Sequence, residues 1–465
     1  MITFKTELES WQTDAYEKLR HIKIGSLYME QGTGKTRTAL ELAKLRFNLD
    51  KVDKILWLCP CSVKSTIQDE FNKHISTGAE NFRIEGIESL SNSIRLNSEL
   101  IKWAKDYRVY LIVDESSLVK NFYRNRTDSI IRLSESCTYR LILNGTPISE
   151  CEEDLFAQWY ILDWRILGYK SYWSFANNHL EYDRYIPDKV VRCLNTDYLI
   201  RKIEPYTYQI TMKELKEKGL LSIPEKHYKQ EYYYLTDEQE EEYERVKDLF
   251  LSDVNEFDTS TIYRLFSALQ QVISGNRIVS RLHEKILCES MFEVPDENPR
   301  IIKLMDTIEQ YGNEKILIWC KYTAEIEQIS QIIKTAYGEK STVEFFGEIS
   351  KKQRHISIKE FENNSQFFIA NRRCGSYGLN LQFCHNSIYY SNDWSSLTRI
   401  QSEDRFCRIG QTEEMYIHDI CARNKLDERI LRCLFRKEKL LESFKKALRE
   451  QRNIYSWVDG GENIA

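Results

Sequence analysis

The sequence predicts an α/β protein made of two doubly wound lobes, each built on a parallel sheet. In each half of the 465-residue chain, four short apolar runs alternate with helical stretches. Runs of this length and composition are typical of strands buried on both faces of a parallel sheet. The first set is 26–29, 55–58, 111–113 and 141–143, and the second is 316–319, 343–346, 367–370 and 387–390.

The region between the two sets, roughly residues 160 to 300, has a mostly helical periodicity. His227 to Leu235 predicts one further strand, and Asp237 to Leu251 a charged amphipathic helix that Thr236 and Gln239 begin as a capping box. Leu426 to Arg449 predicts one long amphipathic helix. We therefore expect a first lobe with a helical insertion at 1–234, a helical linker at 235–299, a second lobe at 300–425, and a C-terminal brace helix and tail at 426–465.

Composition and charge exclude several classes of protein. The net charge of -5 and the pI of about 6.0 provide no global basic field, so nucleic-acid binding would depend on local patches. The chain has no apolar run of membrane length and no signal-peptide core, and we expect no membrane partner. The 12 cysteines are scattered without a Cys-x-x-Cys pair, which argues against zinc and for reduced thiols in a cytoplasmic protein.

A glycine-rich loop follows the first apolar run and precedes a helical stretch, Thr38 to Arg46. Its residues are Gln31, Gly32, Thr33, Gly34, Lys35 and Thr36. The glycines let backbone N–H groups approach a phosphate at the start of the helix. Lys35 would reach the β- and γ-phosphates, and the Thr36 hydroxyl would ligate Mg²⁺. The alternative is a glycine-rich turn at the start of an ordinary helix.

Two acids end the third apolar run of the first lobe. Asp114 and Glu115 follow Val113, and a carboxylate at the carboxyl end of a parallel strand lies at the ligand edge of the sheet. We expect Asp114 to hold Mg²⁺ and Glu115 to orient or deprotonate the attacking water. The alternative is a pair of acids that caps the next helix. Thr146, after the fourth run, is a candidate relay to the second lobe.

Two arginines near the end of the chain complete this pattern. Arg405 and Arg408 are three residues apart, so on a helix they would share one face. Guanidinium groups are permanently charged and grip phosphate oxygens with two donors. Together with the glycine loop far upstream, they predict two lobes that close on one nucleotide.

In this order, the segments resemble the Swi/Snf-like ATPases of helicase superfamily two, over about residues 8 to 440. The matching stretches are Trp11-Gln12, Gln31 to Thr36, Leu58 to Phe71, Asp114 to Ser117, Leu143 to Ile148, Gly378 to Leu381, Asn392 to Trp394 and Gln401 to Thr412. The resemblance implies two RecA-like lobes, ATP and Mg²⁺ as cofactors, and a box similar to D-E-A-H in which Ser117 replaces the histidine.

The resemblance also implies roles for single residues. Gln12 would read the adenine, Gly378 and Gln401 would contribute to the nucleotide site, and Arg405 and Arg408 would act as arginine fingers on the γ-phosphate. The family's large insertions look reduced here. The chain resembles a stripped motor of the kind that a phage or a mobile element would encode, and the expected location is a bacterial or phage-infected cell.

Several side chains could form a track for nucleic-acid phosphates. Lys64 begins a helical stretch, Lys120 follows the acid box, and Arg373 lies in a loop of the second lobe. Trp394 could stack on a base. The alternatives are solvated surface cations and a core tryptophan.

These observations predict an ATP-driven translocase on double-stranded DNA, acting as a monomer. Opening and closing of the lobes would move it along one strand. Two alternatives stay open. One is a strand-separating helicase, and the other is an ATP-gated DNA-binding subunit of a larger complex.

Overall fold

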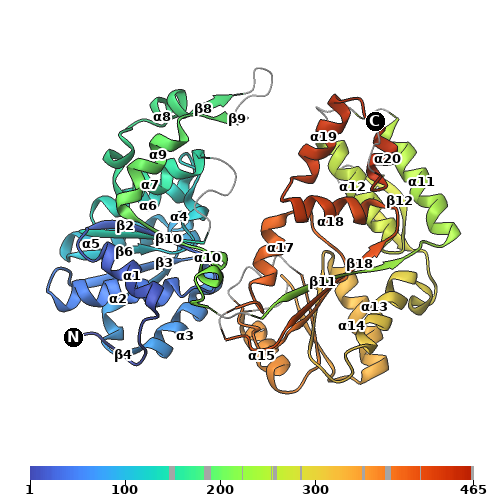
Figure 1. Ribbon diagram of the computed structural model, residues 1–465, viewed down its shortest axis with the longest axis horizontal. Helices are drawn as coiled ribbons and strands as arrows, with labels where there is room; N and C mark the ends of the chain where they lie inside the picture. The colour runs from blue at the N-terminus through green and yellow to red at the C-terminus, as the bar shows by residue number, and fades with distance from the viewer. Residues whose placement is uncertain are drawn as a thin grey trace. The chain divides into compact units, whose positions relative to one another are not determined.

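Two six-stranded parallel sheets form the framework of the chain, and each lies in its own unit, residues 1–222 or 223–465 (Figure 1). The structure is a computed structural model that describes residues 1–145, 152–182, 190–221, 224–252, 254, 259–282, 285–347, 351–371, 379–408 and 410–461. The two sheets with their flanking helices confirm the predicted fold class. Each unit is described below by itself.

The sheet of the first unit has the order β10-β2-β7-β6-β3-β5, and all its pairs are parallel. Its strands are β2 (Ile24–Met29), β3 (Lys54–Cys59), β5 (Phe82–Gly86), β6 (Val109–Val113), β7 (Tyr139–Asn144) and β10 (Thr207–Ile210). Every apolar run predicted for this lobe lies in one of these strands. The order places β7 between β2 and β6, so the ends of these three strands meet at one edge.

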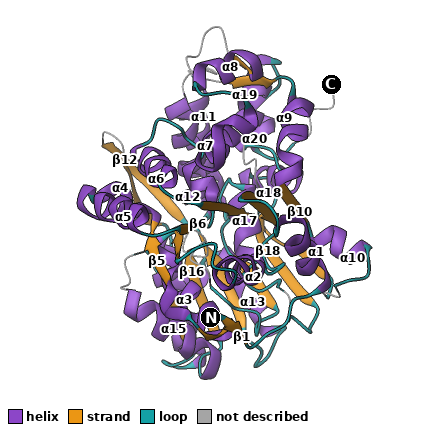
Figure 2. Cartoon of the chain, turned by 90° about the vertical axis from the view of Figure 1, so that its left-hand side faces the viewer, coloured by secondary structure: helices purple, strands orange, loops and turns teal. Residues whose placement is uncertain are grey.

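Helices cover both faces of this sheet. α1 (Ser10–Leu19), α2 (Lys35–Asn48) and α3 (Lys64–His74) lie on one face, and α4 (Ile87–Asn92), α5 (Ile94–Asp106), α6 (Asn125–Glu135) and α7 (Glu153–Leu167) on the other (Figure 1). α4 lies beside the edge strand β5 (Figure 2). The remaining elements are α8 (Tyr172–His179), α9 (Thr196–Ile203), α10 (Met212–Glu217), β1 (Thr3–Phe4), β4 (Ile75–Thr77), β8 (Leu180–Tyr182) and β9 (Val190–Cys193).

The sheet of the second unit has the order β11-β18-β17-β14-β16-β15, again parallel throughout. Its strands are β11 (Lys226–Tyr233), β14 (Ile316–Cys320), β15 (Thr342–Phe345), β16 (Phe367–Asn371), β17 (Asn386–Tyr389) and β18 (Met415–Ala422). Its helices include α13 (Pro299–Glu309), α14 (Thr323–Tyr337), α15 (Lys351–Asn363) and α17 (Ser396–Glu403). The four predicted strands of this lobe are present.

The predicted boundary at residue 234 is corrected by the pairing of β11. This strand was expected within the first lobe, but it pairs with β18 along its whole length and becomes the edge of the second sheet. The division between the units accordingly falls at 222/223. The sequence of a segment indicates its tendency to form a strand, but it does not show which strand it will pair with. The predicted boundary was misplaced for this reason.

The predicted linker, 235–299, is part of the core of the second unit. It forms α11 (Asp237–Leu251), α12 (Thr259–Ile273) and a hairpin of β12 (Asn276–Leu282) and β13 (Lys285–Ser290). The predicted capping box is confirmed. The Thr236 side chain accepts a hydrogen bond from Gln239 N, and the Gln239 side chain accepts one from Thr236 N. Both helices bury apolar side chains against the C-terminal helices.

The predicted single helix from Leu426 to Arg449 is wrong, because it breaks in the middle. α18 (Leu426–Arg436) ends before Lys437, which has a left-handed backbone at φ 56°, and α19 (Leu440–Arg449) and α20 (Ile454–Val458) follow. The bend lets Leu440 and Phe444 pack into the same core as Leu434. Burial of these side chains outweighs continuation of the helix.

Candidate nucleotide site

The glycine-rich loop leaves the carboxyl end of β2 and is anchored by Glu30, the residue that precedes it. Glu30 N donates to Ile210 O, and the Glu30 carboxylate accepts from Met212 N at 2.6 Å. Thr33 turns back on the same residue, because its hydroxyl donates to Glu30 O at 2.7 Å. These bonds tie the base of the loop to β10 and α10, so the glycines are presented from a fixed support.

Two glycines give the loop its shape. Gly32 and Gly34 have φ of 84° and 86°, a left-handed conformation in which a side chain is strained. A Cβ on Gly34 would also lie 2.0 Å from Gln12 Nε2, which donates to Thr33 O. Gln12, predicted to read the adenine, is therefore buried against the loop itself. The requirement for glycine at position 34 is thus both conformational and steric.

The helix behind the loop begins without a side-chain cap. α2 starts at Lys35 with Gly34 as its N-cap, and among the residues that the structure describes no side chain caps the N–H groups of its first turn. Unpaired N–H groups and the helix dipole make such an end an anion site. Thr36, the predicted Mg²⁺ ligand, lies in this first turn.

Lys35 is the second indication that this site is built for an anion. Its Nζ is buried, and among the described residues it has no hydrogen-bond partner. It lies beside the end of β7, since a Cβ on Gly145 would be 3.5 Å from it and 3.6 Å from the Gln31 side chain. A buried ammonium is costly unless it is paired. A phosphate at the start of α2 supplies the missing partner, so the residues fit a nucleotide.

The two predicted acids lie at the same sheet edge. Asp114 directly follows β6 and is buried, and its Oδ1 accepts from Glu115 N at 3.0 Å. Burial and the neighbouring Glu115 raise the pKa of Asp114, while the Lys35 ammonium opposes this shift. A further cation would stabilise the ionised carboxylate. Asp114 with the Thr36 hydroxyl therefore has the oxygen chemistry that suits Mg²⁺.

Glu115 has a strained backbone. Its φ of 50° and ψ of 53° place it in the left-handed region, which is uncommon for a residue with a side chain. It precedes the 3₁₀ turn Ser116–Val119, yet its side chain makes no cap bond there. The alternative that this acid serves as a helix cap is therefore not supported. Strain at the end of a central strand is typical of functional positions.

The arginine pair lies in the second unit, and the prediction that the two arginines share a helix face is wrong. Arg405 and Arg408 do not share a helix face, because α17 ends at Glu403 and both follow it in a turn. Between them, Phe406 and Cys407 are buried in the core on one face of the second sheet. Gln411 closes the turn, donating from Nε2 to Cys384 O and Phe406 O. Arg405 and Arg408 thus lie in a turn, and the buried Phe406 and Cys407 of that turn hold it against the sheet.

A buried ion network fixes α17, from which this turn emerges. Arg399 bonds to Asp419 at 2.6 Å and to Glu403 at 2.7 Å, and its guanidinium lies 3.4 Å from the centre of the Tyr389 ring. Lys226 reaches Glu403 from β11 at 3.0 Å. Although burial opposes it, Arg399 and Lys226 lower the pKa of Glu403. The network ties α17 to β11, β17 and β18. Sequence reasoning missed it, because its partners are far apart in the chain.

Three of the four predicted nucleic-acid residues are described by the structure, and each of the three has a protein partner. Lys64 begins α3, as predicted, and lies 3.2 Å from the Glu85 carboxylate, and Lys120 lies 3.4 Å from Asp154. Trp394 stacks on Tyr263 with centroids 5.5 Å apart and donates to the Gln270 side chain. Its contacts favour the packing alternative.

Of the remaining predicted residues, the structure describes one and leaves three undescribed. Gln401 lies on α17. Thr146, Arg373 and Gly378 lie outside the described residues. The described residues include no group of three or more His, Cys, Asp or Glu side chains arranged for a metal ion. None of their helices combines the length and apolar character needed to cross a membrane.

Two family models match the chain. The model of the SNF2-related domain matches residues 10–287, which is more than half of the chain, and the model of the helicase conserved C-terminal domain matches residues 299–410. The first match contains the glycine loop and the acids, and the second contains the arginine pair.

Curated relatives have related names. The uncharacterized ATP-dependent helicase MG018 of Mycoplasma genitalium is 24% identical over 93% of this chain and 41% of that protein. The putative ATP-dependent helicase/translocase YwqA of Bacillus subtilis is 26% identical over 69% of this chain and 34% of that protein. A mouse SWI/SNF-related regulator of chromatin, subfamily A member 1, is 23% identical over 69% of this chain and 30% of that protein. The chain thus spans less than half the length of these relatives.

Among solved structures, the chain is similar to the Sulfolobus solfataricus SWI2/SNF2 ATPase core in complex with dsDNA. The sequence identity is 22%, the TM-score is 0.41, and the match covers 98% of this chain and 95% of that one.

Proposed function

We propose that this chain, which belongs to the SNF2-related family, is an ATP-hydrolysing motor that moves along double-stranded DNA. The observation that carries the ATPase part is the buried Lys35 ammonium at the start of α2, which has no hydrogen-bond partner within the part of the chain that the structure describes. The names of the relatives support the use of ATP. The duplex substrate rests on the likeness to the Swi/Snf-like ATPases.

The residues of the first unit would bind the triphosphate and prepare the attack. The N–H groups of the loop and of the first turn of α2 would hold the phosphates, and Lys35 would neutralise charge on the β- and γ-phosphates. Asp114 and Thr36 would hold Mg²⁺, which would offset the charge of the phosphate oxygens. Glu115 would orient the attacking water and accept its proton.

Arg405 and Arg408 of the second unit would complete the site when the lobes close. Their guanidinium groups would stabilise the negative charge that develops on the transferred phosphoryl group. Because the loop and the arginine turn belong to different units, ATP binding would favour closure and product release would permit opening. Repeated closure would move the lobes along one DNA strand.

Replacing Glu115 with glutamine is expected to preserve ATP binding and to lower kcat by about a hundredfold or more, the range for a lost general base. Glutamine has the same length and meets the same left-handed backbone, so the change removes only the charge and the basicity. Steady-state ATPase rates and nucleotide titrations would measure both effects. Glu135→Gln, at an exposed position of α6, is the matched control. Unchanged turnover in Glu115→Gln would remove the assigned base.

Duplex DNA is expected to stimulate the ATPase more than single-stranded DNA or RNA does. The test measures the ATPase rate of the full chain with no nucleic acid and with each of these three polymers. The protein is also expected to displace a triplex-forming strand without unwinding a forked duplex. ATP-dependent unwinding of the fork would support the helicase alternative. An ATPase that no nucleic acid stimulates would favour the ATP-gated subunit.

A further inference from the structure

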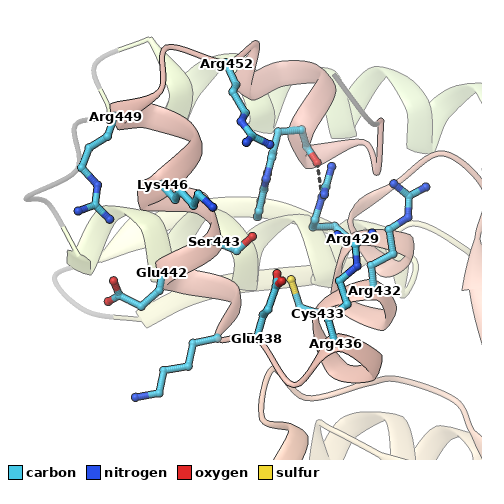
Figure 3. A pocket seen from close by; sticks show the side chains of 12 residues that line it. Arg429, Arg432, Cys433, Arg436, Glu438, Glu442, Ser443, Lys446, Arg449 and Arg452 are labelled. Carbon is cyan, nitrogen blue, oxygen red and sulfur yellow. Dashed lines mark hydrogen bonds between the residues drawn. The ribbon is translucent and has the colours of Figure 1, made fainter. Parts of the chain in front are cut away.

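The C-terminal helices of the second unit enclose a strongly basic pocket. The cavity measures about 550 Å³ and lies between α18, α19 and the segment leading into α20 (Figure 3). Twelve residues line it, of which seven are cations and two are carboxylates, a formal charge of +5. The whole chain carries -5. The pocket therefore has a positive charge in a protein whose net charge is negative. Such a local positive charge is expected of an anion-binding surface.

One of these cations has a structural role. Arg429 donates from Nε to Trp457 O at 2.8 Å, and its guanidinium lies 4.5 Å from the centre of the Trp457 ring. Both side chains are buried. This contact holds α20 against α18 and forms the floor of the pocket. The other six cations of the lining are more exposed than Arg429, and they also have partners within the protein.

The exposed cations lie in two short rows on neighbouring helices. Arg432 and Arg436 are one turn apart on α18, and Lys446 and Arg449 are one turn apart on α19. At 1.5 Å per residue, each row extends about 5 to 6 Å. A nucleic-acid strand carries one phosphate per about 3.4 Å of axis, so each row matches about two successive phosphates. Lys439 and Arg452 extend the rows at their ends.

The nearby carboxylates only partly offset this charge. Arg432 lies 3.4 Å from Glu428, and Glu450 lies 3.9 Å from Lys446 and also pairs with Arg452. The side chain of Lys446 is 65% exposed, so its pair with Glu450 contributes little and leaves the ammonium accessible. Glu438 and Glu442 are the two acids of the lining itself.

The lining favours a phosphate polymer over an acidic protein segment. Protein interfaces are centred on apolar or aromatic anchors that fill pockets. Here the aromatic and thiol groups of the lining, Trp457 and Cys433, are only 3% exposed and offer almost no apolar surface. Arginine forks around a polar cavity are instead suited to phosphate oxygens.

From these observations we infer that the pocket holds backbone phosphates of the DNA duplex, outside the segments that define the family. The inference rests on the proposed function, because it adds a second phosphate contact to the same motor. It predicts a contact that does not depend on base sequence and that weakens with salt.

The test compares two charge-matched triple variants of the full chain. Arg436→Gln, Lys446→Gln and Arg449→Gln together remove three exposed cations of the pocket. Lys303→Gln, Lys340→Gln and Lys359→Gln remove three cations elsewhere in the same unit, on or next to α13, α14 and α15. Glutamine is a good helix former, so neither change should disturb the helices. Thermal unfolding checks that both variants are folded.

Fluorescence anisotropy without nucleotide would measure the affinity for a labelled duplex at several salt concentrations. The pocket variant is expected to bind roughly tenfold more weakly at about 0.1 M salt, with a salt slope shallower by about 2. The control should bind as the wild type does. Equal affinity and slope in the two variants would overturn the inference. So would a polyglutamate peptide that binds the wild type but not the pocket variant, if their duplex affinities are equal.

Lysine acetylation followed by mass spectrometry would locate the contact directly. Duplex DNA is expected to protect Lys439 and Lys446, with Lys340 as the internal reference, and unchanged reactivity of both would count against the inference. The ATPase assay distinguishes this result from failure of the proposed function. A wild type that duplex DNA does not stimulate refutes the motor, whereas a stimulated wild type with equal binding by both variants refutes only the pocket.

Discussion

Replacing Lys35 with alanine is expected to abolish ATP hydrolysis and to weaken ATP binding. The buried Nζ has no hydrogen-bond partner among the described residues, so its hydrogen bonds can go to phosphate oxygens. Removal of this charge should lower kcat by about a thousandfold or more, because phosphoryl transfer depends almost entirely on positioning and electrostatic stabilisation. ATPase assays and titration with a fluorescent ATP analogue would measure the two effects.

The fold should survive this change, since alanine is the best helix former and no protein bond is lost. Lys44→Ala is the matched control, because Lys44 lies on the same helix α2 and pairs with Glu41 near the surface. It should retain normal turnover. Near wild-type hydrolysis by Lys35→Ala would remove the phosphate-loop assignment, and with it the ATPase part of the proposed function.

Most of the strands that the sequence predicted have continuous apolar runs. The two edge strands of the first sheet were missed because they lack such runs, whereas the edge strands β11 and β15 of the second sheet were predicted. β5 reads Phe-Arg-Ile-Glu-Gly and β10 reads Thr-Tyr-Gln-Ile, and neither has an apolar run. β18 was missed for a different reason. It is internal, but it buries His418 and Asp419, which are paired with Glu231 and Arg399. Buried polar pairs of this kind give an internal strand the sequence of a polar segment.

Some features of the nucleotide site follow from residues that are adjacent in the sequence, and others depend on residues far apart in it. Lys35 and Asp114 were predictable because strand, turn and helix are adjacent in sequence, and each element brings its own residue to the sheet edge. The conformation around Arg405 was not predictable from the local sequence. A three-residue spacing suggests a helix face, but burial of Phe406 against the second sheet ends α17 before the arginines. That outcome depends on a core whose other members are distant in sequence.

Replacing Arg408 with alanine is expected to lower kcat by about a thousandfold while leaving ADP affinity almost unchanged. This is the range for loss of an arginine finger. ADP affinity should persist, because the loop, Lys35 and the start of α2 all belong to the first unit. The turn should also persist. Gln411 N bonds to the Arg408 backbone carbonyl at 3.0 Å, and the neighbouring Cys407 stays buried.

Two further variants separate a catalytic arginine from a structural one. Arg408→Lys should rescue kcat poorly, because an ammonium cannot reproduce the two-pronged guanidinium contact with phosphate oxygens. Arg423→Ala removes a partly exposed guanidinium from the same unit and should leave kcat unchanged. DNA binding without nucleotide should change little in Arg408→Ala, since its partner would be the γ-phosphate. If Arg408→Ala instead weakened ADP and DNA binding together and spared kcat, the turn would have a structural or DNA-binding role, and catalysis by two closing lobes would be refuted.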